Sequence, residues 1–249
     1  YKLNNKNINI HCNENFNNFN LYGLRKNDYC FKNTDQENLF FLTGDSHASH
    51  LIPMLNNSDK IKNIYFSNFP NKCLLIKQCN LDIIENIKKI NSYKKDYKKI
   101  FYIFSSRVEK FDKDIDLIQK NLFHNLKYID KDINIILVSP IPIFLKGPKK
   151  CVILNIDCYI EKKQDLMKNK KIINIYKKLD KENDNIHLFN IYEIICPKNL
   201  CYIYVKKDDF LWFNDDDHLS NEGSKHLSKY FNIWLFERFD QQNLILQPS

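Results

Sequence analysis

The chain of 249 residues is 43% hydrophobic and 14% aromatic, so it can bury a full core as one domain, and a disordered chain is excluded. No stretch reaches about 18 consecutive apolar residues, which excludes a membrane-spanning helix. The net charge of +8 comes almost entirely from lysine, because arginine occurs only at Arg25, Arg107 and Arg238. Arginine is preferred for bidentate recognition of phosphates and bases, so this balance favours solvated lysine surfaces, and we expect no nucleic-acid partner.

Apolar runs alternate with longer amphipathic segments, which is typical of an α/β fold with a parallel sheet. We expect a single flavodoxin-like three-layer α/β/α domain over 36–240, after an irregular lead-in over 1–35 and before a tail over 241–249. A hairpin is expected at 200–213. The expected strands are Leu39–Thr43, Ile61–Ser67, Ile100–Ser105, Ile133–Ser139 and Ile186–Asn190, and the expected helices are Ala48–Asn56, Leu81–Ser92, Asp112–Tyr128, Lys163–Leu179 and Asn221–Phe239.

The eight cysteines fall into four pairs that are close in the sequence. No pair has Cys-x-x-Cys spacing, which argues against a zinc ribbon or a thioredoxin-type redox site. An even number in local pairs suits disulfides that close surface loops in an oxidising compartment, with eight reduced thiols in a cytosolic protein as the alternative. The expected disulfides are Cys12–Cys30, Cys73–Cys79, Cys151–Cys158 and Cys196–Cys201.

The segment around Ser46 is the most informative part of the chain. An apolar strand is expected to end at Gly44, and a helix-compatible run begins near Ala48. The turn between them lies at the carboxyl end of the first strand, where open α/β sheets bind their ligands. A serine at this place is exposed, and the N-terminus of the next helix favours developing negative charge. Ser46 is therefore a candidate nucleophile, with an ordinary turn as the alternative.

A second polar segment precedes the last expected helix. Asp215 lies three residues before His218, and a carboxylate at this spacing can hold the imidazole through Nδ1–H. The Nε2 atom is then free to take the proton of a serine hydroxyl. The run of aspartates that ends at Asp217 could instead bind a cation or cap the helix, but the glycine and glutamate of a calcium loop do not follow. His47 and His50 could share one helical face as metal ligands, but no third ligand is suggested nearby, and no metal site is predicted.

These two segments resemble the SGNH/GDSL hydrolase superfamily, and most closely the SGNH domain fused to acyltransferase family 3 membrane proteins. The resemblance extends from about residue 10 to residue 239 and is most specific around Ser46 and His218. In that group a cysteine-flanked loop and a short hairpin precede the second segment. The matching stretches are Gly44-Asp45-Ser46-His47-Ala48, Ser139-Pro-Ile-Pro142, Cys196-Pro-Lys-Asn-Leu-Cys201 and Phe213-Asn-Asp-Asp-Asp-His-Leu-Ser220.

The chain departs from the wider superfamily in the loops that bind the oxyanion. General members carry glycine in these loops, but no glycine lies between residues 45 and 146. The third strand ends in Phe104-Ser-Ser-Arg-Val108, and Val108 replaces a tryptophan that is common in the fused domains. The oxyanion hole must therefore combine the Ser46 N–H with other groups. The candidates are Arg107, for which a surface role is the alternative, Ser105 and Ser106, with His47 shaping the site.

On these residues we expect acyl transfer, in which Ser46 attacks an acyl ester, His218 takes and returns the proton, and Asp215 orients His218. The resemblance implies an O-acetyl group passed from a membrane acyltransferase domain to a cell-envelope carbohydrate, without a cofactor. It also implies a periplasmic or extracellular location. We interpret the chain as a mature or excised domain of a larger parent protein, so we expect it to be tethered to the membrane through an upstream segment. The alternatives are a secreted carbohydrate O-acetyl esterase and a catalytically silent glycan-binding module of the same fold.

Overall fold

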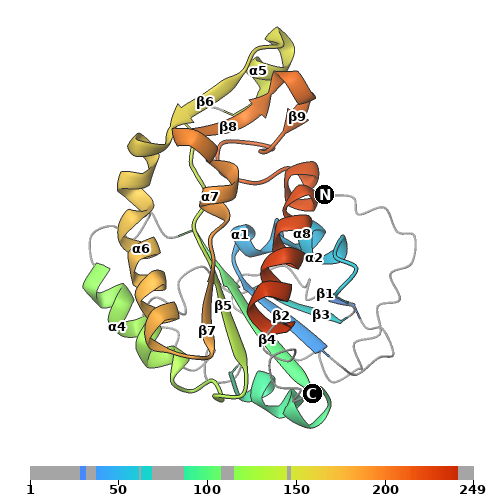
Figure 1. Ribbon diagram of the computed structural model, residues 1–249, viewed down its shortest axis with the longest axis vertical. Coiled ribbons are helices and arrows are strands. Elements are labelled where there is room, and N and C mark those ends of the chain that lie inside the picture. The colour runs from blue at the N-terminus through green and yellow to red at the C-terminus, as the bar shows by residue number, and fades with distance from the viewer. Residues whose placement is uncertain are drawn as a thin grey trace, which may run out of the picture.

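The computed structural model describes residues 29–31, 38–61, 63–68, 87–107, 115–144 and 147–240. Within these ranges the chain forms a main sheet with helices on both faces and a smaller sheet at one end (Figure 1). Most of the expected lead-in, the tail over 241–249, and Cys12, Cys73 and Cys79 of the expected disulfides lie outside them. Among the described helices, none combines the length and the apolar character that a bilayer crossing requires.

The main sheet has six strands in the order β1-β3-β2-β4-β5-β7. All neighbours are parallel except β1, which pairs antiparallel with β3 at the edge. After β2 the chain adds β3 on one side and the later strands on the other, so the strand order reverses at β2. This arrangement confirms the expected flavodoxin-like α/β/α fold. The strands are β1 (Tyr29–Phe31), β2 (Asn38–Gly44), β3 (Ile64–Asn68), β4 (Lys99–Ser105), β5 (Asn134–Val138) and β7 (Ile186–Phe189).

The central strands are apolar without interruption because helices cover both of their faces. In β2, Phe40 and Leu42 pack in one core layer, whereas Leu39 and Phe41 pack in the other. The strands β4 and β5 repeat this alternation, and all side chains of residues 135–138 are buried. Since the sheet is held from both faces, the loops at the ends of its strands rest on a rigid support.

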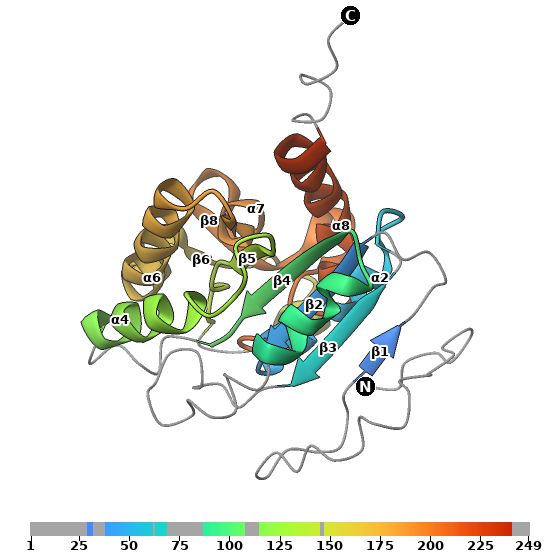
Figure 2. The same ribbon diagram turned by 90° about the horizontal axis from the view of Figure 1, so that it is seen from below.

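Helices α2 and α8 cover one face of the sheet, and α4, α6 and the helical residues 87–92 cover the other (Figure 2). The hydroxyl of Ser220 caps α8 by accepting the Gly223 N–H at 2.8 Å. The Met54 N–H donates to the Ser224 hydroxyl at 3.0 Å and ties α2 to α8. The helices are α1 (Ser46–Ser49), α2 (Ile52–Asn56), α4 (Ile115–Leu126), α5 (Lys149–Leu154), α6 (Lys162–Glu182), α7 (Ile191–Ile195) and α8 (Asn221–Leu235), which a π-helical turn (Phe236–Asp240) extends.

The small sheet lies at the end of the main sheet where β5 and β7 finish (Figure 1). It contains β6 (Cys158–Glu161), β8 (Leu200–Val205) and β9 (Phe210–Leu211), all antiparallel. The Cys151–Cys158 disulfide joins α5 to β6, and the Cys196–Cys201 disulfide joins the end of α7 to β8, as the sequence predicts for both pairs. The hairpin expected at 200–213 is present as β8 and β9, with β6 as a third strand.

The structure contains α5, β6 and α7, which the sequence analysis does not expect, and it differs from the expected elements at further places. The helix expected to begin at Ala48 begins at Ser46 and is divided into α1 and α2. Proline has no N–H with which to continue the ladder of α1, so Pro53 instead lies in the first turn of a new helix. The strand β1 lies inside the segment expected to be irregular, because a strand of three residues is too short to show a period. The strand expected from Ile61 begins at Ile64.

Candidate active site

A sharp turn joins β2 to α1 and places Ser46 at the carboxyl end of the sheet, where the strand order reverses. Gly44 makes this turn possible, because its φ of +144° is one that residues with a side chain rarely adopt. A β-carbon at Gly44 would lie 1.7 Å from the backbone oxygen of Ser105 in β4. The turn therefore requires glycine, and its backbone packs directly against the end of β4.

The side chain of Asp45 fastens this turn to the segment that follows β4. Asp45 is buried, and its Oδ1 accepts the backbone N–H of His47 at 2.8 Å, which caps α1. Its Oδ2 accepts the hydroxyl of Ser106 at 3.0 Å and the backbone N–H of Arg107 at 2.9 Å. Both carboxylate oxygens hold the turn in place, while the neighbouring Ser46 remains exposed.

The loop between β9 and α8 is a tight hairpin that carries Asp215 and His218. Phe213 and Leu219 form an antiparallel bridge at its base. Inside the loop, Oδ1 of Asp215 accepts the backbone N–H of Asp217 at 3.0 Å and of His218 at 2.7 Å. Aspartate often binds the backbone of its own turn in this way, so Asp215 sets the conformation of the loop that contains it.

Ser46, His218 and Asp215 come together at the carboxyl end of the main sheet. Nε2 of His218 lies 2.8 Å from Oγ of Ser46, and Nδ1 lies 3.0 Å from each carboxylate oxygen of Asp215. When Nδ1 donates its proton to a carboxylate, Nε2 carries the lone pair that can accept the serine proton. The arrangement is therefore chemically suited to nucleophilic attack by Ser46.

Asp217 brings a second carboxylate to His218. Its Oδ1 lies 2.8 Å from Nδ1 of His218, and its Oδ2 contacts the guanidinium of Arg107. Nε2 of His47 lies 3.6 Å from the same Oδ2, and the Asp217 side chain is only 4% exposed. The His47 imidazole lowers the pKa of Asp217 to about 2, with smaller contributions from His218 and Arg107, and burial opposes the shift.

His50 completes a cluster of three imidazoles with His47 and His218, whose ring centroids lie 5.2 to 6.0 Å apart. His50 is buried, and its Nδ1 accepts the backbone N–H of Leu219 at 3.3 Å, which ties the loop between β9 and α8 to the end of α1. Burial, together with the charges of His47 and His218, holds the pKa of His50 well below its ordinary value. A neutral His50 therefore supports the loop between β9 and α8 through its hydrogen bond with Leu219.

The expected oxyanion groups have other partners in the structure. The Ser105 hydroxyl donates to a backbone carbonyl of α1 at 3.2 Å, and the Ser106 hydroxyl donates to Asp45. Arg107 donates its backbone N–H to Asp45 and pairs its guanidinium with Asp217. These contacts give all three residues a supporting role around the turn, and their action on an oxyanion stays a prediction.

Among the residues that the structure describes, two groups of side chains have the atom spacing of a cation site. One contains His47, Asp217 and His218, and the other consists of the aspartates at 215–217. The first group shares His218 with Ser46, and the guanidinium of Arg107 already places positive charge against Asp217. A bound cation would have to compete with this ion pair, so we continue to interpret the site as one that acts without a metal.

The family model of the SGNH domain fused to AT3 domains matches residues 11–232. The chain belongs to this family. Among solved structures, the lipopolysaccharide acetyltransferase periplasmic domain of Salmonella ser. Paratyphi A is similar, with a TM-score of 0.52, 20% identity and 85% coverage of each chain. A lipolytic protein of the G-D-S-L family from Veillonella parvula gives a TM-score of 0.49 and 14% identity over 81% of this chain and 100% of its own. The Salmonella domain shares the fold of this SGNH domain, and no curated protein matches the chain.

Asp45 and Asp217 are the residues of this SGNH site that sequence reasoning misses. The sequence predicts Asp215 alone as the partner of His218, and Asp217 enters the sequence analysis only as part of a run that could bind a cation or cap the helix. Three successive aspartates before a histidine are the only signal for Asp217. Which of them is buried depends on the contact with Arg107, which no local pattern reveals.

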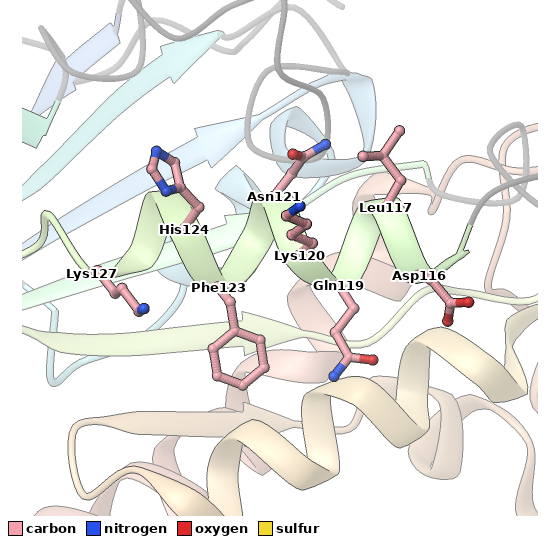
Figure 3. A pocket seen from close by; sticks show the side chains of 8 residues that line it. All are labelled: Asp116, Leu117, Gln119, Lys120, Asn121, Phe123, His124 and Lys127. Carbon is pink, nitrogen blue, oxygen red and sulfur yellow. The ribbon is translucent and has the colours of Figure 1, made fainter.

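A separate hollow lies beside α4, and none of its described lining residues belongs to the site around Ser46 (Figure 3). All of its described lining residues belong to α4, so within the described part of the chain no second element contributes converging polar groups to it. The candidate site of this SGNH domain is therefore assigned by its chemistry and not by the hollow. The side chains in Figure 3 are Asp116, Leu117, Gln119, Lys120, Asn121, Phe123, His124 and Lys127.

Proposed function

We propose that this SGNH domain transfers an acyl group, specifically O-acetyl, to a cell-envelope carbohydrate through an acyl-enzyme on Ser46. The observation that carries the proposal is the 2.8 Å distance between Oγ of Ser46 and Nε2 of His218, with Asp215 on the Nδ1 side of the ring. A serine nucleophile that is activated by a histidine base uses this order of hydroxyl, imidazole and carboxylate. Membership in a family of SGNH domains fused to AT3 domains agrees with acyl transfer.

In the first half-reaction, Ser46 attacks the acyl carbonyl of the donor while His218 takes the hydroxyl proton. The tetrahedral intermediate collapses when the bond to the donor oxygen breaks, and His218 returns the proton to that oxygen. In the second half-reaction, a carbohydrate hydroxyl gives its proton to His218 and attacks the acyl group on Ser46. The acylated sugar leaves, and the proton returns to Ser46. The Ser46 N–H is our first candidate for the group that stabilises the negative oxygen in both steps.

We infer that a membrane acyltransferase domain of the AT3 type supplies the acyl group. We also infer that the SGNH domain works on the periplasmic or extracellular face and is tethered to the membrane by another part of a longer protein. The family description supports the donor. The two disulfides of the small sheet suit an oxidising compartment. The similar Salmonella domain is described as periplasmic and as part of a lipopolysaccharide acetyltransferase, which supports a carbohydrate acceptor.

The variant Ser46→Ala tests the nucleophile. We expect turnover of a small acetyl ester to fall by roughly 10⁴- to 10⁶-fold, and a fluorophosphonate probe to label the wild-type protein but not the variant. Ser49→Ala is the matched control, because Ser49 lies in the same short helix and its hydroxyl donates only to the Ser46 carbonyl, at 2.8 Å. A Ser46→Ala protein that keeps more than about a tenth of wild-type turnover excludes the acyl-enzyme. An unlabelled wild-type protein favours the silent glycan-binding module.

A carbohydrate O-acetyl esterase is the second candidate, because Ser46 is exposed and water can therefore reach an acyl-enzyme. The two activities differ in which hydroxyl is held against the acyl carbonyl, and a bound sugar gains a large effective concentration over bulk water. Product partitioning with an acetyl donor and a panel of envelope oligosaccharides separates them. We expect acetylated sugar and slow hydrolysis. Fast hydrolysis, together with deacetylation of acetylated glycans, assigns the domain as an esterase.

A further inference from the structure

Two carboxylates face the same nitrogen of His218, and their surroundings differ. Nδ1 lies 3.0 Å from Asp215 and 2.8 Å from Asp217. The side chain of Asp215 is 46% exposed, whereas that of Asp217 is 4% exposed. Water screens a charge at the surface far more than a charge in the interior. The carboxylate of Asp217 therefore acts on the imidazole with less screening than that of Asp215.

The two carboxylates also differ in the other groups that they contact. Oδ1 of Asp215 accepts two backbone N–H groups of its own loop, so this side chain has a structural task besides its contact with His218. Asp217 instead meets the guanidinium of Arg107, from the segment after β4, through Oδ2, while its Oδ1 faces His218. A buried carboxylate needs such a compensating charge, since an isolated one is expensive to bury. The His47 imidazole, 3.6 Å from the same Oδ2, and Arg107 together provide this compensation for Asp217 beside Nδ1.

We propose that Asp217 is a second positioning carboxylate for His218 that stabilises the imidazolium formed when Ser46 loses its proton, and that Arg107 offsets part of the Asp217 charge from the other carboxylate oxygen. This inference rests on the proposed function of Ser46 and His218. The proton that leaves Ser46 stays on Nε2, the Nδ1 proton stays between the ring and the two carboxylates, and neither aspartate is protonated. Asp215 shapes the loop and orients the ring, and Asp217 supplies the less screened negative charge.

Among the described residues, the charged and titratable groups that surround His218 come from three segments of the chain. Asp215 and Asp217 belong to its own loop, His47 and His50 come from the α1 segment, and Arg107 follows β4. Asp217 is in contact with both His218 and Arg107, so it is the group through which Arg107 influences the ring. Removing the charge of Asp217 destabilises the imidazolium, and the ring then stays neutral to a lower pH.

The isosteric variants Asp217→Asn, Asp215→Asn and Asp216→Asn test this division of roles. NMR titration of the His218 imidazole, without substrate, should show a midpoint lowered by roughly one pH unit or more in Asp217→Asn, and by less in Asp215→Asn. The acid limb of the pH profile of kcat/KM should move in the same direction, with kcat reduced by about tenfold at neutral pH and KM little changed. Asp216→Asn is the matched control, since Asp216 is exposed in the same loop and loses the same charge.

Arg107→Gln is the second variant, in case Asp217→Asn does not fold. It removes part of the positive charge that offsets Asp217, while Nε2 of His47 remains 3.6 Å from the same Oδ2. The midpoint of His218 should therefore move upward, opposite to the shift in Asp217→Asn. Equal midpoints in the wild type, Asp217→Asn and Arg107→Gln overturn the proposal, as does a larger shift in Asp215→Asn than in Asp217→Asn. The NMR titration needs no catalysis, so failure of the Ser46 nucleophile, detected by fluorophosphonate labelling, is recognised separately.

Discussion

The turn that carries Ser46 and the small sheet lie at the same end of the main sheet, but they are held together by different means (Figure 1). Close backbone packing at Gly44 and hydrogen bonds to the buried Asp45 fix the turn. Two disulfides fix the small sheet, and its outer part exposes apolar side chains on α5. In the turn, one added β-carbon at Gly44 is enough to clash with the backbone of β4. In the small sheet, two covalent bonds add to the packing of Ile203 and Tyr204 in the core, and the apolar side chains of α5 stay exposed.

Gly44→Ala is the sharpest way to test the constraint in the turn. The added β-carbon would meet the Ser105 carbonyl oxygen at 1.7 Å, and alanine rarely adopts a φ of +144°. We expect the free energy of unfolding, measured by urea denaturation, to fall by more than about 4 kcal/mol, or the protein not to fold. Gly147→Ala is the control, because its β-carbon would have no neighbour closer than 3.5 Å. Similar losses in both variants would show that the turn is not specially constrained.

The disulfides are the corresponding test of the small sheet. We expect Cys151→Ala combined with Cys158→Ala to lower the free energy of unfolding by about 2 kcal/mol, from the loop entropy returned to the unfolded chain. Removing Cys196 and Cys201 should cost more, because both of these side chains are fully buried. Denaturant titrations measure both effects. Fluorophosphonate labelling of Ser46 should keep its wild-type rate in the first variant, and a large loss of labelling there would show that the two regions are coupled.

The acid stability of the protein separates the two regions again, because only the Ser46 region depends on a buried ion pair. The pKa of Asp217 is lowered to about 2 from 3.8, so its stabilising contribution is complete above pH 4 and disappears as the pH falls to about 2. Asp217→Asn lacks this contribution. The difference in unfolding free energy between the wild type and Asp217→Asn should therefore shrink by about 2 kcal/mol from pH 5 to pH 2. A constant difference would mean that Asp217 titrates normally.

The sequence predicts those parts of the fold that produce a local pattern, such as a run of apolar residues or a short spacing between two polar residues. Strands β2, β4 and β5 give continuous apolar runs because both faces are covered, and the spacing of Asp215 and His218 gives the loop chemistry. The pairing of Asp217 with Arg107 cannot be read in this way, since it joins two segments that are distant in the sequence. The addition of β6 to the hairpin escapes prediction for the same reason, because cross-strand pairing between distant segments leaves no local period.

Substitution of an exposed apolar side chain in α5 should have the smallest effect on the free energy of unfolding, in contrast to substitution of Gly44 in the turn. Ile153 is 77% exposed, between Val152 and Leu154, which are also exposed, while the disulfide at Cys151 holds the start of this segment. A side chain that loses little contact with water on folding contributes little through the hydrophobic effect. We therefore expect Ile153→Ser to change the free energy of unfolding by less than about 0.5 kcal/mol, with an unchanged slope in urea. Ile103→Ala, at a fully buried position in β4, is the control and should cost about 2 to 5 kcal/mol. A loss above about 1 kcal/mol in Ile153→Ser would show that α5 is packed against another surface, and that disulfides alone do not account for the small sheet.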